Sequence, residues 1–366
     1  MAFAYIASYL YDTDNEQPLN VPRIDRRRLR EIDNPFELTL TEFRRLYRLS
    51  PGMVENLVSQ LDNQLRGSRI TALSTEKQVL AALRFYATGC YQRPVGEQWG
   101  ISMSQTSISR CIHRVTDAIN NSMFTSKVKF PMTQLECQAA KEIFASAPSP
   151  FVAGTIGAID CTHVAILAPK NNESNYVNHH GYHSMNVQMI CDPNLKILNV
   201  NAKFPGARHD SFIWSFSAAR RVMQRSFETG NHNTFLIGDS GYPLEPWLMT
   251  PLPNEPEGTP KFRYNEALCK ARNPIERLFG VLKGTWRCLS RQRVLLYDPG
   301  FAGRVVNACA TLHNVRLGDQ TTAFDDRVVY DPEILSTNDD SAAPSSVAKR
   351  VQQRIIANFF LNIRIT

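Results

Sequence analysis

The sequence predicts an α/β domain with a mixed sheet, preceded by an all-helical region. Between residues 38 and 119 the apolar residues recur at steps of three and four, which is the period of amphipathic helices. From about residue 150 short apolar runs of strand character replace that period, and helical patterns are interspersed among them. The chain has 366 residues, more than one apolar core usually supports, so two or more substructures are expected.

The predicted segments, in chain order, are a basic, poorly ordered arm over 1–36, a helical region over 37–125, the α/β domain over 150–315, and a polar linker with a last helix over 316–366. The arm contains the arginine-rich run "PRIDRRRLR" (22–30). Such a run is typical of a nuclear-import signal or a phosphate-contacting arm. A solvated tail is the alternative that the sequence leaves open.

The helical region begins with two amphipathic segments. In 38–65, the pair Ser50-Pro51 is a favourable helix start, because proline suits the first helical position. In 74–89, Ser74 can cap the first turn and Gly89 can close the last one. Both segments are therefore predicted to be helical.

A helix-turn-helix pattern follows in "VGEQWGISMSQTSISRCIHRVTDAI" (95–119), with a turn at Gly100 and a long helix beginning near Ser102. The long helix has an apolar inner face, made by Ile108, Ile112, Val115 and Ile119. Its outward positions are Gln105, Thr106, Ser109, Arg110 and Arg114. Short polar donors with arginines behind them suit a DNA recognition helix. A plain helical bundle is the alternative.

The α/β domain is predicted from its strand patterns. "FVAGTIGAIDCTHVAIL" and "FLIGD" are predicted as strands, and "NVQMICDPNLKILNVNAKFPG" as a hairpin that turns at Asp192-Pro193-Asn194. Helices are predicted at 211–226 and at about 265–290. Beyond Asn314 the chain becomes polar, with a linker at 336–346 and a last helix at 347–363.

Composition excludes several classes of protein. The net charge of +7 and the pI of about 9.0 favour an anionic partner. No apolar run is long enough to span a bilayer, and the N-terminus makes a poor signal peptide, so we expect a soluble intracellular protein. The eight cysteines are scattered, which disfavours a disulfide framework. For His179, His180 and His183 a polar loop is favoured over a metal site.

Two predicted strands run into an aspartate, which indicates a carboxylate site. "FLIGDSGYPL" (235–244) leads into Asp239 and "GTIGAIDCTH" into Asp160. Glu276, in the helical segment "NPIERLFGVLKGTWRCL" (273–289), supplies a third acid, and Asp210, in "GARHDSFIW", a fourth. Carboxylates are the ligands that Mg²⁺ and Mn²⁺ prefer, and two such ions can stabilise both oxygens of a phosphodiester that is being cut. The sequence therefore predicts a divalent-metal centre for phosphodiester chemistry.

On the same helix, Lys283 and Arg287 share an edge with Glu276, where a phosphate could approach. Each acid also has a structural alternative. Glu276 has capping-box spacing after Asn273, and Pro274 between them could kink or restart the helix. Likewise, Asp210 could cap the next helix, and Asp239 could stabilise its Ser-Gly turn.

Six ordered motifs carry a resemblance to a known family: "GAIDCTHVAI", "YHSMNVQMICD", "FPGARHDSFIW", "LIGDSGYPL", "NPIERLFGVLKGTWRCL" and "VVNACATLHN". Over about 150–315 the chain resembles PIF/Harbinger transposases, and more closely the Harbinger transposase-derived nuclease family. The resemblance implies an RNase H-like (retroviral-integrase-like) core with a metal-binding DDE set. The aspartates of that set fall on Asp160 and Asp239, the glutamate on Glu276, and the family's additional aspartate on Asp210. It also implies that the strands bearing Asp160 and Asp239 lie side by side, and that a separate Myb-like protein assists DNA binding.

From the sequence we predict a DNA nuclease or transposase in which Asp160, Asp239 and Glu276 are catalytic and hold Mg²⁺ or Mn²⁺, with Asp210 as a further metal ligand. Arg110, Arg114, Lys283 and Arg287 are the predicted DNA contacts. The expected location is the nucleus, alone or together with the cytoplasm, and self-association stays open. The alternative is a domesticated DNA-binding or scaffold protein that does not cut. An α/β phosphatase or ATPase is disfavoured, because the chain has no phosphate-binding loop.

Overall fold

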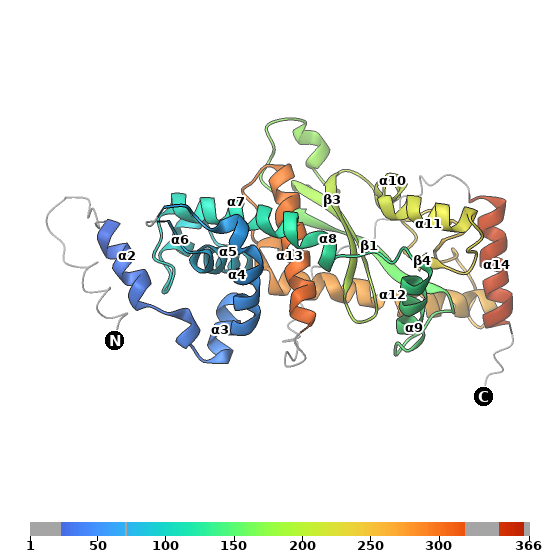
Figure 1. The fold of residues 1–366 in the computed structure, drawn as a ribbon. Coiled ribbons are helices and arrows are strands. Elements are labelled where there is room, and N and C mark those ends of the chain that lie inside the picture. Colours follow the sequence, from blue (N-terminus) through green and yellow to red (C-terminus); the bar gives the residue numbers. More distant parts are fainter. Residues whose placement is uncertain (1–22, 70–71, 319–343, 362–366) are drawn as a thin grey trace.

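The computed structural model describes residues 23–69, 72–318 and 344–361. The N-terminal part is helical, the middle holds a sheet, and helices follow it (Figure 1). The N-terminal elements are α2 (Arg23–Ile32), η1 (Pro35–Glu37), α3 (Leu40–Tyr47), α4 (Pro51–Leu65), α5 (Thr75–Thr88), α6 (Gln92–Gly96), α7 (Gln105–Ser122), α8 (Phe124–Lys127) and α9 (Gln134–Ala145).

The later elements are β1 (Thr155–Ala165), η2 (Glu173–Tyr176), β2 (Ser184–Cys191), β3 (Ile197–Pro205), α10 (Asp210–Ser215), α11 (Ala218–Glu228), β4 (Phe235–Ile237), β5 (Leu248–Met249), α12 (Pro260–Thr285), η3 (Arg287–Leu289), α13 (Pro299–Leu317) and α14 (Ser346–Phe360). None of the helices in the described ranges is long and apolar enough to cross a bilayer. The mixed α/β class that the sequence predicts is confirmed.

Within the segment predicted as a poorly ordered arm, residues 23–32 form α2, and η1 begins at Pro35. Hydrogen bonds hold this segment to the helical region. The guanidinium of Arg30 donates to the carbonyl of Ser102 at 2.7 Å, and the carbonyl of Asp33 accepts from Lys77 at 3.4 Å. Residues 1–22 lie outside the described ranges.

The predicted helix boundaries around Ser50, Ser74 and Gly89 are confirmed. α4 begins at Pro51 with Ser50 as its N-cap. The hydroxyl of Ser74 accepts from the backbone N–H of Lys77, and Gly89 ends α5 with a φ of 61°. That positive φ is costly for other residue types, which explains the glycine.

The helix-turn-helix pattern is present as α6, a turn and α7. α7 begins at Gln105 and not near Ser102, because Ser102 has a φ of 41° and cannot continue a right-handed helix. Ser104 caps the helix instead, accepting from the N–H of Ser107 at 3.2 Å. The predicted apolar face of α7 (Ile108, Ile112, Val115 and Ile119) is fully buried.

The sheet has the strand order β3-β2-β1-β4-β5. β1, β2 and β3 are antiparallel neighbours, whereas β4 lies parallel to both β1 and β5. The hairpin turns as predicted at Asp192-Pro193-Asn194, where the Asp192 carboxylate accepts from the N–H groups of Asn194 and Lys196. An antiparallel hairpin beside parallel strands is the mixed sheet of an RNase H-like core.

Two apolar clusters cover the sheet. One lies between the sheet and α12, α13 and α14 and continues into α3, α4, α5 and α7. The other packs residues of α9, α10 and α11 on the opposite face. Figure 1 shows α13 between the N-terminal helices and the sheet. The first cluster runs through both predicted regions, so the N-terminal helices share an apolar core with the sheet domain, and the division into domains stays a prediction.

Three predicted helices can be compared with the structure. The segment 211–226 is divided between α10, which ends at Ser215 with Phe216 as its C-cap, and α11, which Ser217 caps. α12 runs from Pro260 through Pro274 to Thr285 without a break. The last predicted helix is confirmed as α14. Most of the predicted linker, up to residue 343, lies outside the described ranges.

Candidate metal centre

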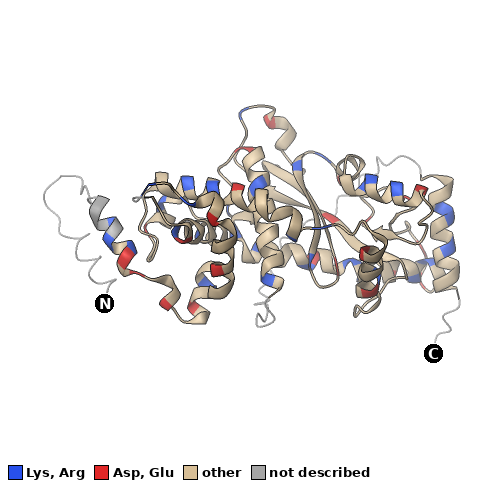
Figure 2. Ribbon diagram, viewed as in Figure 1, with Lys and Arg blue, Asp and Glu red and all other residues tan. Residues whose placement is uncertain are grey.

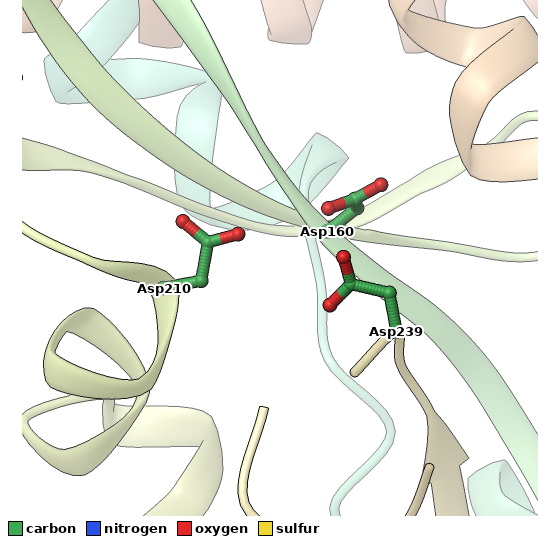
Figure 3. A group of neighbouring side chains, drawn as sticks. All are labelled: Asp160, Asp210 and Asp239. Carbon is green, nitrogen blue, oxygen red and sulfur yellow. The ribbon is translucent and has the colours of Figure 1, made fainter. Parts of the chain in front are cut away.

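Three aspartates converge beside the middle of the sheet. Asp160 lies on β1, Asp210 is the first residue of α10, and Asp239 lies two residues after the end of β4. Each offers one carboxylate oxygen, and these oxygens all lie within 4.8 Å of one another. Figure 3 shows the three side chains turned toward a common point. We call Asp160, Asp210 and Asp239 the aspartate trio.

The strand pairing explains why Asp160 and Asp239 meet. β1 and β4 are parallel neighbours, as the resemblance implies, and their pairing ends at Ala158 and Ile237. The interpretation of Asp160 as a strand-end residue is wrong, because β1 continues past Asp160 to Ala165. Its pairing with β2 runs from Ala158 to Ala165. Because β4 stops first, the edge of β1 at Asp160 is left open on that side and Asp239 turns into the gap.

Asp239 also has the turn role that the sequence left open. Its Oδ1 accepts from the backbone N–H of Gly241 at 3.0 Å. A Cβ at position 241 would lie 3.2 Å from that same oxygen, so a glycine permits the close turn. The turn therefore orients the Asp239 carboxylate toward the trio, and the two roles are compatible.

Asp210 does not cap α10, because His209 occupies the N-cap position. Instead, the side-chain amide of Asn186 donates to Asp210 Oδ1 at 3.0 Å and to the carbonyl of Arg208 at 2.8 Å. Asn186 lies on β2 and is buried. The amide thus fixes the start of α10 to the sheet and holds Asp210 in the trio.

Arg272 is a site residue that sequence reasoning missed. It lies on α12, and its guanidinium donates to Asp160 Oδ2 at 2.7 Å and also to Glu276 Oε1. Its side chain is only 10% exposed. An Arg–Glu pair four positions apart on a predicted helix is a signal that could have identified it.

Glu276 is not part of the trio. It reaches Asp160 only through Arg272, and its side chain is 54% exposed. The capping alternative for Glu276 is wrong, because Thr259 caps α12 and Asn273 lies inside it. Glu276 therefore lies at the edge of the site, on a continuous helix that packs against β1.

The surroundings of Asp160 and Asp239 raise the pKa of both carboxyl groups. Burial raises the pKa of Asp160 well above its ordinary value, and the charges of Asp239 and Asp210 raise it further, whereas Arg272 lowers it. Burial also raises the pKa of Asp239, against the effects of Arg272 and of the Gly241 N–H. Without a cation the site is therefore short of positive charge.

Two buried, uncharged side chains, those of Cys161 and Tyr242, lie near the trio. Cys161 Sγ and Tyr242 Oη lie 3.2 Å apart, and both residues are buried. Burial raises the pKa of the Cys161 thiol and of the Tyr242 hydroxyl well above their ordinary values, so both stay neutral. Cys161 and Tyr242 therefore add no charge near the trio, and Arg272 is the positively charged residue that pairs with one of its carboxylates.

The predicted DNA contacts are in different surroundings. Arg110 and Arg287 are exposed. The guanidinium of Arg114 donates to the carbonyl of Leu65 at 2.7 Å, at the end of α4, so part of its capacity is used within the protein. Lys283, which the sequence places where a phosphate could approach, is buried on α12, a helix that packs against β1.

The chemistry of the trio fits a divalent cation. Three carboxylates offer hard oxygen donors from three separate parts of the chain, and the raised pKa values of Asp160 and Asp239 mark a site at which a cation would favour the charged carboxylates. Within the described ranges this is the one group of His, Cys, Asp or Glu residues with such spacing. His179, His180 and His183 are not part of such a group, and His183 Nε2 lies 3.0 Å from Glu173 Oε1.

Comparison with known proteins places the chain in a family, and the matched segment includes all three aspartates. The family described as DDE superfamily endonuclease matches residues 159–314. "Putative nuclease HARBI1" of Bos taurus is 36% identical over 298 residues, 80% of this chain and 81% of that protein. Its Homo sapiens counterpart is 36% identical over 299 residues, 80% of this chain and 81% of that protein. "Protein ALP1-like" of Arabidopsis thaliana is 26% identical over 267 residues, 70% of this chain and 64% of that protein. No solved structure matches the chain.

Proposed function

This chain belongs to the Harbinger transposase-derived nuclease family, and from that membership we propose that it is a divalent-metal-dependent endonuclease that cuts DNA. The observation that carries the proposal is the aspartate trio, whose carboxylate oxygens lie within 4.8 Å of one another. Strand transfer to a DNA 3′-hydroxyl is a second reaction that the same centre could support.

In the proposed mechanism the aspartate trio would hold two Mg²⁺ or Mn²⁺ ions, and Glu276, at the edge of the site on α12, would be a further ligand. When bound, the ions would stabilise the attacking and leaving oxygens of the phosphodiester. Asn186 keeps Asp210 in place, and the Gly241 turn does the same for Asp239. These contacts preorganise the carboxylates, so little reorganisation is needed when substrate arrives.

Arg272 has a separate part in this proposal. Its ion pairs with Asp160 and Glu276 hold both carboxylates while the site has no cation. Its guanidinium would also suit a phosphate oxygen brought to the trio, since arginine binds phosphate oxygens in a bidentate manner. Arg272 would therefore orient the two carboxylates and contribute positive charge beside the substrate phosphate.

DNA is the proposed substrate because basic side chains lie around the sheet. Figure 2 shows Lys and Arg on α7, α11 and α14. Arg110 and Arg287 are exposed and available to phosphates. We further propose a nuclear location, served by the arginine-rich segment 22–30, and a Myb-like DNA-binding partner. Tagging and co-purification from nuclear extract test both.

A plasmid-nicking assay tests the main proposal. The purified chain should nick supercoiled plasmid with Mg²⁺ or Mn²⁺ and not with EDTA. An Asp239→Asn variant should be inactive. The matched control is Asp298→Asn, which changes an N-cap residue of α13, where asparagine caps equally well. Equal nicking by the parent and by Asp239→Asn would refute the proposal.

One observation favours a second candidate, a DNA-binding scaffold that does not cut. Arg272 forms ion pairs with both Asp160 and Glu276, as the cation of a structural ion-pair network would. In that case the protein should bind DNA with Kd values unchanged by Mg²⁺ and should show no nicking. The same assay, run together with a binding measurement, separates the two candidates.

A further inference from the structure

Three phenylalanines form a partly exposed cluster on the outer side of α10. The ring centroids of Phe212 and Phe216 are 4.9 Å apart, and Phe204 on β3 lies 6.0 Å from Phe212 and 6.4 Å from Phe216. Phe212 is 37% exposed and Phe216 58% exposed. We call Phe204, Phe212 and Phe216 the phenylalanine platform. Neighbouring exposed aromatic rings lower solubility, so such a cluster often marks a contact site.

Two arginines border the platform. The guanidinium carbon of Arg208 lies 4.8 Å from the centroid of the Phe212 ring. Arg221 donates through Nη1 to the carbonyl of Phe216 at 3.1 Å, and its residue is exposed. The three rings are tilted against one another, with interplanar angles of 86°, 40° and 48°, so the most exposed ring, that of Phe216, is the one that offers a face for stacking. An exposed aromatic ring with guanidinium groups nearby suits single-stranded nucleic acid, because a base stacks on the ring while phosphates meet the cations.

The platform is joined to the aspartate trio by short contacts. Phe212 is two residues after Asp210 on α10, and Phe204 pairs across the sheet with Asn186. The Asn186 amide donates both to Asp210 Oδ1 and to the carbonyl of Arg208. The buried side chain of Asn186 therefore fixes the Asp210 carboxylate relative to the backbone of Arg208, which borders the platform.

From these contacts we propose that the phenylalanine platform stacks a DNA base that has left its pair next to the phosphodiester held at the aspartate trio. This rests on the proposed nuclease function and adds its substrate class, DNA with an unpaired base beside the cleavage point. A protein partner suits the surface less well, since Arg208 and Arg221 border it with positive charge. The platform is a positioning device and takes no part in the chemistry.

The experiment measures binding in the Asp239→Asn protein, where DNA stays uncut. Two duplexes of one sequence are compared, one fully paired and one with a single unpaired 2-aminopurine. Phe216→Ala should weaken binding of the unpaired duplex about tenfold and leave the paired duplex within about twofold, because stacking on an aromatic ring is lost only for the free base. The fluorescence of the unpaired 2-aminopurine should be quenched when the Asp239→Asn protein binds the duplex, and should be brighter when the protein also carries Phe216→Ala.

Matched variants keep the test decisive. Phe216→Trp should restore binding, since a larger ring still stacks. Phe359→Ala removes an exposed phenylalanine, 45% exposed on α14, and should leave both duplexes unaffected. Phe212→Ala serves as a second variant if Phe216→Ala unfolds. Equal losses on both duplexes, no loss, or a dimer in the parent that Phe216→Ala dissociates would each overturn the platform proposal.

Failure of this proposal is distinguishable from failure of the proposed function. Plasmid nicking by the unmodified protein is scored in parallel. Nicking without a preference for the unpaired duplex refutes the platform and keeps the nuclease. A Phe216-dependent preference without nicking refutes the nuclease and keeps the platform as a DNA-binding surface.

Discussion

Asp239→Asn removes one charge from the aspartate trio and keeps the shape of the side chain and its turn contact with Gly241. Two opposite effects follow from the structure. The site should lose its affinity for cations and its nicking activity, while the protein without cations should become as stable as the parent or more stable. If Asp239 had only a structural role, its replacement would lower the stability of the protein and leave cation binding and nicking unchanged.

The size of the stability effect follows from the spacing of the carboxylates. Two full charges 4.8 Å apart repel by about 3 to 4 kcal/mol at an effective dielectric constant of about 20. The folded protein avoids part of this repulsion by keeping protons, which is what the raised pKa values of Asp160 and Asp239 mean. We therefore expect Asp239→Asn to raise the free energy of unfolding without cations by about 1 to 2 kcal/mol.

The effect also has a definite sign with pH. The pKa of Asp239 is raised in the folded protein, so above its unfolded value of 3.8 the folded state holds more protons than the unfolded state. The contribution of Asp239 to stability is thus largest in acid and is lost as the pH rises through the folded pKa. The advantage of Asp239→Asn over the parent should grow from about pH 4 toward neutrality and vanish in stronger acid.

Urea unfolding of the parent, Asp239→Asn and Asp298→Asn, with EDTA and with Mn²⁺, measures these effects. Mn²⁺ should stabilise the parent and the Asp298→Asn control but not Asp239→Asn. Nicking by Asp239→Asn should fall at least about a thousandfold, which corresponds to about 4 kcal/mol. An Asp239→Asn protein that is less stable in EDTA, still stabilised by Mn²⁺ and still active would refute the reasoning and leave Asp239 as a turn residue.

Three other predictions concern the remaining site residues. Arg110→Ala should weaken DNA binding and lower its log–log salt slope by about one, and an unchanged slope would make α7 a packing helix. Glu276→Gln should abolish nicking, whereas parental nicking with intact Mg²⁺-induced thermal stabilisation would leave Glu276 as a partner of Arg272 only. Alanines at 26–28 should reduce nuclear import of a tagged protein, and an import rate equal to that of the parent would exclude this segment as the signal.

Local patterns in the sequence determined most of the secondary structure. The spacing of apolar residues predicted α4, α5, α7 and α14, because a helix face must be apolar wherever it meets a core. Caps such as Ser74 and Gly89 marked boundaries, since their side-chain and backbone preferences act within a few residues. The order of six motifs also sufficed for the family, which the relatives confirm.

Those local patterns did not predict which residues meet at the site in the folded protein. Residues 160, 210 and 239 meet only because β4 pairs parallel to β1 and stops early, and because Asn186 docks α10 on the sheet. The same packing buries Lys283 and places Arg272 between Asp160 and Glu276. A one-dimensional pattern records which residue types can take part in a charged site. Which of them meet is decided by contacts between elements far apart in the chain, since Coulomb energy and burial depend on distances that exist only after the sheet and helices have packed.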